Sequence, residues 1–224
     1  MSQRGVQVEH IVIDGGSNDG TRALLEEWCS DSCFRFISEP DTGVYDAFNK
    51  GLSLATGECI GFLNAGDIYQ NHDSLADICA ALTENNIDLV FGDVEMTPAH
   101  DLAMTVRRYR AIGFSPSHLL RGFMPPHPAT YVKKSTFDSV GVFCEKFRIA
   151  GDFEWAIRAF LLAEINSSYL AKTIVRMPVG GISNNGIRAI WRNTKEMHQA
   201  LRMHDLPASW VRLLARLPRK WIRR

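Results

Sequence analysis

Short apolar runs alternate with amphipathic stretches along the first 95 residues of the chain. The apolar runs at residues 8–14, 34–37, 59–63 and 88–94 have the length of buried strands. The first three of them end in turns rich in glycine or polar residues. Strands that alternate with helices are typical of a mostly parallel sheet covered on both faces. The pattern therefore predicts an α/β fold.

Three stretches between these runs place apolar residues at helical spacing, so each is expected to pack one face against the sheet. The three stripes are Leu24, Leu25 and Trp28; Phe48, Leu52 and Ala55; and Leu75, Ile78, Cys79 and Leu82. Asp19 or Thr21 is expected to cap the first helix. Gly57 is expected to cap the end of the second helix.

From about residue 97 to residue 150 the pattern loosens, because five prolines interrupt it. Loops and short strands of this kind often shape one side of a pocket. A further helix is predicted to begin at Gly151, with Trp155, Ala159 and Leu162 on its apolar face.

The composition is that of an ordinary globular protein, with 46% hydrophobic and 22% charged residues among 224. No apolar run reaches the roughly 18 residues that a transmembrane helix needs, and the first residues have no signal-peptide pattern. The five cysteines have neither CxxC pairing nor zinc spacing. We therefore expect a cytoplasmic protein in a reducing compartment.

The net charge of zero conceals a basic end, because ten Lys and Arg residues stand against two acidic ones from Gly186 onward. A helical apolar stripe lies within this tail and is formed by Trp210, Leu213, Leu214, Leu217 and Trp221. Pro218 should kink or end that helix. The pattern favours an amphipathic segment on an anionic membrane surface. The alternative is a helix packed on the domain with a solvated basic end, whereas nucleic acid is not expected without a recognised module.

Two of the predicted turns carry side chains suited to a ligand site. In an open α/β sheet, ligands collect beyond the carboxyl ends of the strands. The first strand runs into residues 14–20, and the strand at 59–63 runs into Gly66 and Asp67. Gly66 lets the backbone approach a ligand, and Asp67 is a hard oxygen donor suited to Mg²⁺ or Mn²⁺. Either turn alone is more often an ordinary turn with a helix cap, but together they predict a nucleotide-phosphate and metal site.

Five segments, taken in order, resemble family 2 glycosyltransferases of the GT-A fold. They are EHIVIDGGSNDGT at 9–21, EPDTGVYDAFNKG at 39–51, LNAGD at 63–67, PHPAT at 126–130 and IAGDFEW at 149–155. The Asn-x-Gly-Asp turn resembles that of bacterial exopolysaccharide and colanic-acid-type transferases. The resemblance implies a three-layer GT-A sandwich at 1–185, with a nucleotide part to about residue 95 and an acceptor part beyond it. Residues 186–224 would form the basic tail.

The resemblance also implies roles for individual residues. Asp67 would bind the metal, Mg²⁺ or Mn²⁺, which offsets charge on the leaving diphosphate. The residues expected to bind the nucleotide sugar are Asp14, Gly16, Ser17, Asp41, Asp46, Asn49, Lys50 and Asn64. Lys50 could contact phosphate, although a lysine one turn into a surface helix is more often only solvated.

On the acceptor side, the resemblance implies that Asp152 is the base that takes the proton of the attacking hydroxyl. Asp152 could instead only cap the helix, and the two roles are compatible. His127, Glu154 and Trp155 are the other expected acceptor or phosphate residues. A helical turn would point Glu154 away from Asp152, and His127 in its proline-rich loop is equally well structural.

Two departures from the family pattern affect this interpretation. Asn64 and Gly66 stand where many relatives have carboxylates, so cation affinity should be weak unless diphosphate and water complete the shell. The sequence also opens late: relatives have a preceding central strand that contributes half of the nucleotide pocket. We therefore expect an N-terminally truncated GT-A domain.

The leading hypothesis is an inverting transferase that moves a sugar from a UDP- or GDP-sugar to a polysaccharide or lipid-linked acceptor in cell-envelope or exopolysaccharide synthesis. It would act at the inner face of the cytoplasmic membrane. The alternative is an inactive GT-A remnant that serves as a binding or scaffold protein. A nucleotidyltransferase is disfavoured, because the turn after the first strand lacks the expected basic residue.

Overall fold

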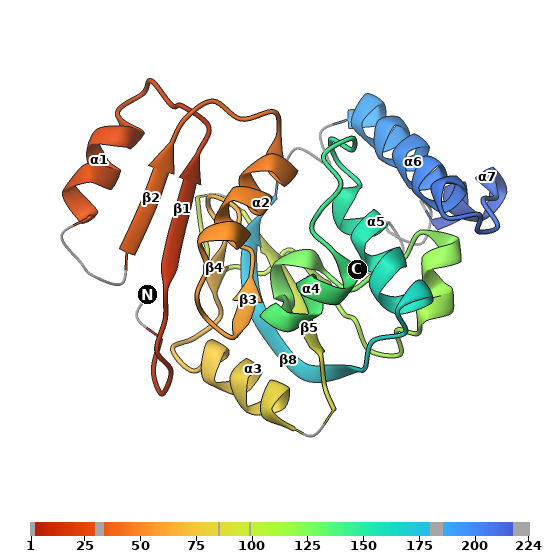
Figure 1. The fold of residues 1–224 in the computed structure, drawn as a ribbon, viewed down its shortest axis with the longest axis horizontal. Coiled ribbons are helices and arrows are strands. Elements are labelled where there is room, and N and C mark those ends of the chain that lie inside the picture. The colour runs from red at the N-terminus through yellow and green to blue at the C-terminus, as the bar shows by residue number, and fades with distance from the viewer. Residues whose placement is uncertain (1–2, 30–33, 85, 99, 180–185, 217–224) are drawn as a thin grey trace.

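The computed structural model describes residues 3–29, 34–84, 86–98, 100–179 and 186–216. Its first unit is a two-stranded parallel sheet, in which β1 (His10–Asp14) pairs with β2 (Phe34–Ser38) from His10 opposite Phe34 to Asp14 opposite Ser38. Helix α1 (Thr21–Trp28) connects the two strands on the outer side of this unit (Figure 1). Two strands that run the same way need such a crossover, which the sequence pattern predicted.

The main sheet has six strands in the order β3-β7-β5-β8-β4, with β6 paired to β5. Their bounds are β3 (Cys59–Gly61), β4 (Ile68–Tyr69), β5 (Leu89–Thr97), β6 (Arg107–Tyr109), β7 (Thr130–Lys133) and β8 (Ser167–Pro178). Strands β5 and β8 are parallel, whereas the other four pairings are antiparallel. The α/β class is confirmed, but the expectation of a mostly parallel sheet is wrong for this part. Short connections such as the one from β5 to β6 can join only antiparallel strands.

Helices cover both faces of the main sheet (Figure 1). They are α2 (Val44–Leu54), α3 (Ser74–Thr83), α4 (Lys134–Val140), α5 (Gly151–Ile157) with a π turn (Arg158–Leu162), α6 (Gly186–Met203) and α7 (Trp210–Leu214). Two 3₁₀ turns complete the set, η1 (Pro116–Arg121) and η2 (His127–Ala129). The predicted helix that begins at Gly151 is confirmed.

Strand β5 supplies both halves of the core, because successive side chains point to opposite faces of a sheet. Val90 and Val94 belong to a cluster with the α3 residue Ile78. Leu89 and Phe91 belong to a larger cluster that draws on α2, α4, α5, α6 and α7. The larger cluster therefore unites the two parts expected on either side of residue 95, and it includes part of the basic tail.

The tail helices pack on the domain rather than standing apart from it. Leu213 is fully buried, and so is the Arg216 side chain, which donates to the carbonyl of Gly122 and to Oγ1 of Thr194. Helix α7 ends at Leu214, and Leu213 of the predicted apolar stripe is buried in the core. Leu217, Pro218, Trp221 and the last basic residues lie outside the described residues.

Several smaller expectations are also corrected. Leu24 and Trp28 of α1 remain exposed, at 44% and 52%, and so does Leu162. Helix α2 ends at the cap residue Ala55 rather than at Gly57. Strand β8, the longest strand that pairs with β5, was not predicted from the sequence. Among the described helices, none combines the length and apolar character needed to cross a membrane.

Candidate active site

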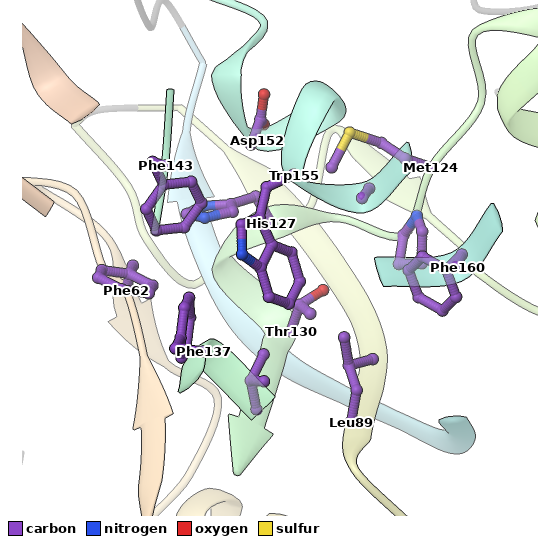
Figure 2. A pocket seen from close by; sticks show the side chains of 13 residues that line it. Phe62, Leu89, Met124, His127, Thr130, Phe137, Phe143, Asp152, Trp155 and Phe160 are labelled. Atoms are coloured by element: carbon purple, nitrogen blue, oxygen red, sulfur yellow. The ribbon is translucent and has the colours of Figure 1, made fainter. Parts of the chain in front are cut away.

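Three segments that are distant in the sequence meet around Asp152, the second residue of α5. Tyr45 comes from α2, His127 from η2, and Phe62 from the end of β3. The carboxylate and His127 both line a mostly apolar chamber, in which Figure 2 shows His127 between Phe143 and Trp155. With a volume of about 20 Å³, the chamber holds on the order of one water molecule. It therefore backs the site and is too small for a sugar.

Tyr45 orients Asp152 from the α2 side. Its hydroxyl oxygen lies 2.7 Å from the carbonyl oxygen of Ile149 and 3.1 Å from Oδ1 of Asp152. Burial, followed by the charge of Asp152, raises the pKa of Tyr45 far above its usual range, so the phenol remains a donor. A Cβ at Gly151 would lie 2.7 Å from the Tyr45 ring, so only glycine allows this approach. Oδ2 of Asp152 has no protein donor among the described residues.

His127 lies in an aromatic cluster that joins the predicted motifs. Its ring stacks on Phe48 of α2 at 5.3 Å and on Phe62 at 5.7 Å between centroids. Burial lowers the pKa of His127, and the nearby charge of Asp152 partly opposes that effect. A neutral imidazole has one donor and one acceptor nitrogen. Since neither nitrogen has a hydrogen-bond partner within the described ranges, both are available to a ligand.

Two hydrogen bonds between Asn64 and Asp67 hold the predicted metal turn. The Asp67 amide donates to the Asn64 carbonyl at 3.0 Å, and the Asn64 amide donates to Oδ2 of Asp67 at 3.3 Å. Gly66 has a φ of 92°, which a residue with a side chain rarely adopts. Burial raises the pKa of Asp67, against the lowering effect of the hydrogen bond from Asn64. No basic side chain pairs with Asp67 in the described part of the chain.

A divalent metal fits this turn only if a bound ligand supplies part of its coordination shell. Asp67 offers one carboxylate, and the described residues contain no group of three or more His, Cys, Asp or Glu side chains that could hold a metal. Mg²⁺ commonly binds proteins through one or two carboxylates and completes its shell with phosphates and water. Asp67 suits that mode.

The turn after β1 is built around Asp14. This carboxylate is buried and accepts hydrogen bonds from the amide and hydroxyl of Ser17 and from the Ser38 hydroxyl at 2.7 Å. These donors lower the pKa of Asp14, with the Ser17 hydroxyl as the largest cause. Gly16 and Ser17 are exposed beside it. A Cβ at Gly15 would lie 2.6 Å from Oδ2 of Asp41, which places a second carboxylate at this edge. Oδ1 of Asp41 accepts from the Gly43 amide at 3.0 Å.

The predicted α2 residues are engaged with the protein itself. Nζ of Lys50 lies 2.8 Å from Glu39 and 3.4 Å from Asp46. Both Asn49 side-chain atoms bond the loop at Phe143: Oδ1 accepts from its amide at 3.0 Å, while Nδ2 donates to its carbonyl at 2.9 Å. The expectation that Asn49 binds the nucleotide is corrected, because its amide braces the acceptor side.

Two expected acceptor residues are also corrected. Glu154 is 2% exposed and forms ion pairs with Arg158 and His204, both at 2.8 Å. Trp155 is buried, and its Nε1 donates to the Gly141 carbonyl at 2.8 Å. Both side chains hold α5 in place through these contacts, and Trp155 also lines the chamber beside Asp152. Sequence reasoning missed Tyr45, although it stands inside the second family segment.

Comparison with known proteins agrees with this geometry. The model of the family described as glycosyl transferase family 2 matches residues 2–150. A PGL/p-HBAD biosynthesis glycosyltransferase of Mycobacterium bovis BCG is 30% identical over 218 residues, which is 95% of this chain and 79% of that protein. An uncharacterized glycosyltransferase of Mycobacterium tuberculosis, Rv1514c, is 34% identical over 161 residues, covering 70% of this chain and 59% of the relative.

Solved structures share the fold at low identity. Staphylococcus aureus TarS 1–349 with UDP-GlcNAc has a TM-score of 0.64 at 16% identity, with 85% of this chain covered. The mannosyltransferase PcManGT of Pyrobaculum calidifontis, with GDP-Man and Mn²⁺, has a TM-score of 0.62 at 17% identity, with 92% covered. This chain spans 56% and 59% of those two chains. The family match over most of the chain, the curated relatives and the shared fold lead to one conclusion: the chain belongs to glycosyl transferase family 2, a family of transferase enzymes, and has the GT-A fold.

Proposed function

We propose that this protein transfers a sugar from a UDP- or GDP-sugar to an acceptor hydroxyl with inversion, and that Asp152 is the base. One observation carries the assignment: the Tyr45 hydroxyl and the Phe153 amide hold Oδ1 of Asp152, while Oδ2 has no donor among the described residues. Asp152 lines the same chamber as His127, whose imidazole has no hydrogen-bond partner in that part of the chain. Complexes of the structural neighbours with UDP, UDP-GlcNAc or GDP-Man support the donor class.

The proposed reaction is a single displacement at the anomeric carbon. The acceptor oxygen forms a bond to that carbon as its proton passes to Asp152 and the bond to the diphosphate oxygen breaks, so the configuration inverts. The neutral His127 orients the acceptor hydroxyl. Asp67 would hold Mg²⁺ or Mn²⁺, which supplies Lewis-acid stabilisation of the leaving diphosphate.

The exposed turn after β1 is proposed to receive the nucleotide. Gly16 and Ser17 present a backbone free of bulky side chains, and Asp14 holds that turn in shape. Asp41 and Asp46 lie on the neighbouring segment. Asp41 is the better placed for a ribose hydroxyl, because it is engaged only by the Gly43 amide among the described residues, whereas Asp46 accepts from Thr42 at 2.9 Å and also pairs with Lys50. Lys50 would reach phosphate only by leaving Glu39, and Asn64 is exposed beside Asp67.

The decisive experiment compares Asp152→Asn with wild type against a panel of UDP- and GDP-sugars in Mn²⁺. Transfer should fall by about 10²–10⁴-fold, the range that removal of a general base produces. Nucleotide affinity should remain within about twofold, since amide and carboxylate have the same shape. Asp138→Asn on α4, an exposed carboxylate, is the matched control. Near wild-type turnover of Asp152→Asn would overturn the assignment, and absence of turnover in the wild type with every donor would favour a binding protein.

The proposed acceptor is a polysaccharide or lipid-linked saccharide, at an anionic membrane surface. Arg188, Arg192 and Lys195 are exposed on α6 and form no ion pair with any described residue. Trp191, 55% exposed, lies among them and stacks on Trp210 at 5.6 Å. Tryptophan and basic residues together favour the headgroup layer.

Vesicle flotation tests the membrane contact. Wild type should float with phosphatidylglycerol vesicles but not with phosphatidylcholine vesicles, and added salt should release it. The triple variant R188Q/R192Q/K195Q should lose roughly 1 kcal/mol of binding per removed charge. Equal flotation of this variant, or binding of wild type to neutral vesicles, would contradict an electrostatic contact.

A further inference from the structure

The loop that leads into Asp152 is held by a residue of the tail. Oε2 of Glu196, on α6, accepts hydrogen bonds from three consecutive backbone amides. The distances are 3.1 Å to Arg148, 2.8 Å to Ile149 and 3.0 Å to Ala150. Hydrogen bonds from amides to a charged acceptor are stronger than those between neutral groups. A single carboxylate oxygen therefore fixes the turn that ends two residues before Asp152.

The same turn is fixed from its other side by Tyr45. The phenol lies 2.7 Å from the Ile149 carbonyl oxygen, while Glu196 accepts from the Ile149 amide. Ile149 thus has both of its backbone polar groups bound by side chains from α2 and α6. The chain reaches Asp152 from a point whose peptide planes cannot rotate without breaking one of these contacts.

The charge of Glu196 is committed to this loop. Arg188, Arg192 and Lys195 share its open hollow along α6, yet none of them lies within ion-pair distance of it. The docking of α6 does not depend on this carboxylate, because Met197, Ala200 and Leu201 are buried in the main core. Loss of the carboxylate should consequently free the loop and leave the helix in place (Figure 1).

We propose that Glu196 is a positioning residue for the transfer reaction: through the backbone of 148–150, it holds Asp152 in the orientation that receives the acceptor proton. The C-terminal helix α6 is then part of the catalytic apparatus. This inference rests on the proposed role of Asp152. Misplacement of a reacting group by about 1 Å costs on the order of 100-fold in rate, so the effect of this distant residue is measurable.

The test compares Glu196→Ala, Glu196→Gln and the control Gln199→Ala, an exposed residue in the same hollow. Glu196→Ala should lower kcat by about 10–100-fold, with KM for donor and acceptor within about twofold. Glu196→Gln, whose carbonyl oxygen still accepts from the amides, should recover most of that loss. Hydrogen exchange should accelerate at the amides of 148–150 in Glu196→Ala and remain unchanged at Phe160.

The outcomes separate this inference from the proposed function. If Asp152→Asn abolishes transfer while Glu196→Ala keeps the wild-type kcat, Glu196 has no positioning role. If Asp152→Asn is fully active, the base assignment itself is wrong. Equal losses in Glu196→Ala and Glu196→Gln, or a fall in donor affinity that matches the fall in kcat, would indicate a general packing role and also overturn the inference. If Glu196→Ala does not fold, the kcat of Glu196→Gln and the hydrogen exchange of the 148–150 amides in that variant decide whether Glu196 has a positioning role.

Discussion

The turns after β1 and β3 look alike in sequence, since each follows a short apolar strand and contains glycine and aspartate. The hydrogen bonds to their carboxylates nevertheless differ. Asp14 accepts three side-chain and backbone hydrogen bonds, which lower its pKa. Asp67 accepts one long hydrogen bond from Asn64, and burial raises its pKa. Hydrogen bonds within the protein favour the charged form of the first carboxylate, whereas burial disfavours the charged form of the second. A bound cation would offset that cost, in line with the metal role proposed for Asp67.

Among the variants that test this difference between the two turns, Asp67→Asn should have the largest effect. Transfer at a fixed Mn²⁺ concentration should fall by at least about 100-fold, because Lewis-acid stabilisation of the leaving group contributes several kcal/mol. Removal of the metal with EDTA should abolish wild-type activity, and Mn²⁺ should restore it. Asp138→Asn should respond to Mn²⁺ as wild type does. A titration in which Asp67→Asn has the wild-type Mn²⁺ dependence would contradict a metal role for Asp67.

A smaller effect, on stability, should have opposite signs at the two turns. Asp14→Asn should lower the free energy of unfolding at pH 7 by about 1–3 kcal/mol, because the Ser17 and Ser38 donors lose a charged acceptor. Asp67→Asn should raise the melting temperature slightly at pH 7 in the absence of metal, because it removes a charge that burial disfavours. Urea unfolding and thermal melts of both variants measure this contrast.

The pH dependence follows from the two directions of pKa shift. The stabilisation by Asp14 is present above its unfolded pKa of about 3.9 and is lost as pH falls through its lower folded value. The folded pKa of Asp67 is raised, so its cost appears as pH rises from the unfolded value through that higher folded value. The gain in Asp67→Asn should thus vanish below about pH 3.9. Changes in stability of the same sign in Asp14→Asn and Asp67→Asn would contradict the proposed difference between the two turns.

The sequence pattern predicts the elements whose burial is regular along the chain. The stripe Leu75, Ile78 and Leu82 lies in the core as expected, and β5 includes most of its predicted run. Strand β8 escaped because its exposed and buried positions do not alternate strictly. It pairs with β5 along most of its length and with β4 only at Val175 and Arg176. Strands β4 and β6 have only two and three residues, too few for any pattern.

Candidate residues could be predicted where the local sequence places them, but not where contacts between distant segments do. Asp14 and Asp67 stand in turns that the periodicity predicts, and the resemblance to the family indicates Asp152 at the start of a predicted helix. Asn49 bonds a loop 94 residues away, and Glu196 bonds the loop before α5 across 46–48 residues. Nothing in the local sequence indicates either contact. The fold brings these partners together, so their roles appear only in three dimensions.

The family match stops at residue 150, one position before the glycine that admits the Tyr45 ring. Anyone who trims or recombines this protein at that limit would discard the aspartate, the glutamate that steadies its loop, and the leucine at 213 that fills the shared interior. A transplant into another transferase should therefore keep the chain from α2 through Arg216 in one piece, because Tyr45 and Asn49 bond residues beyond position 140.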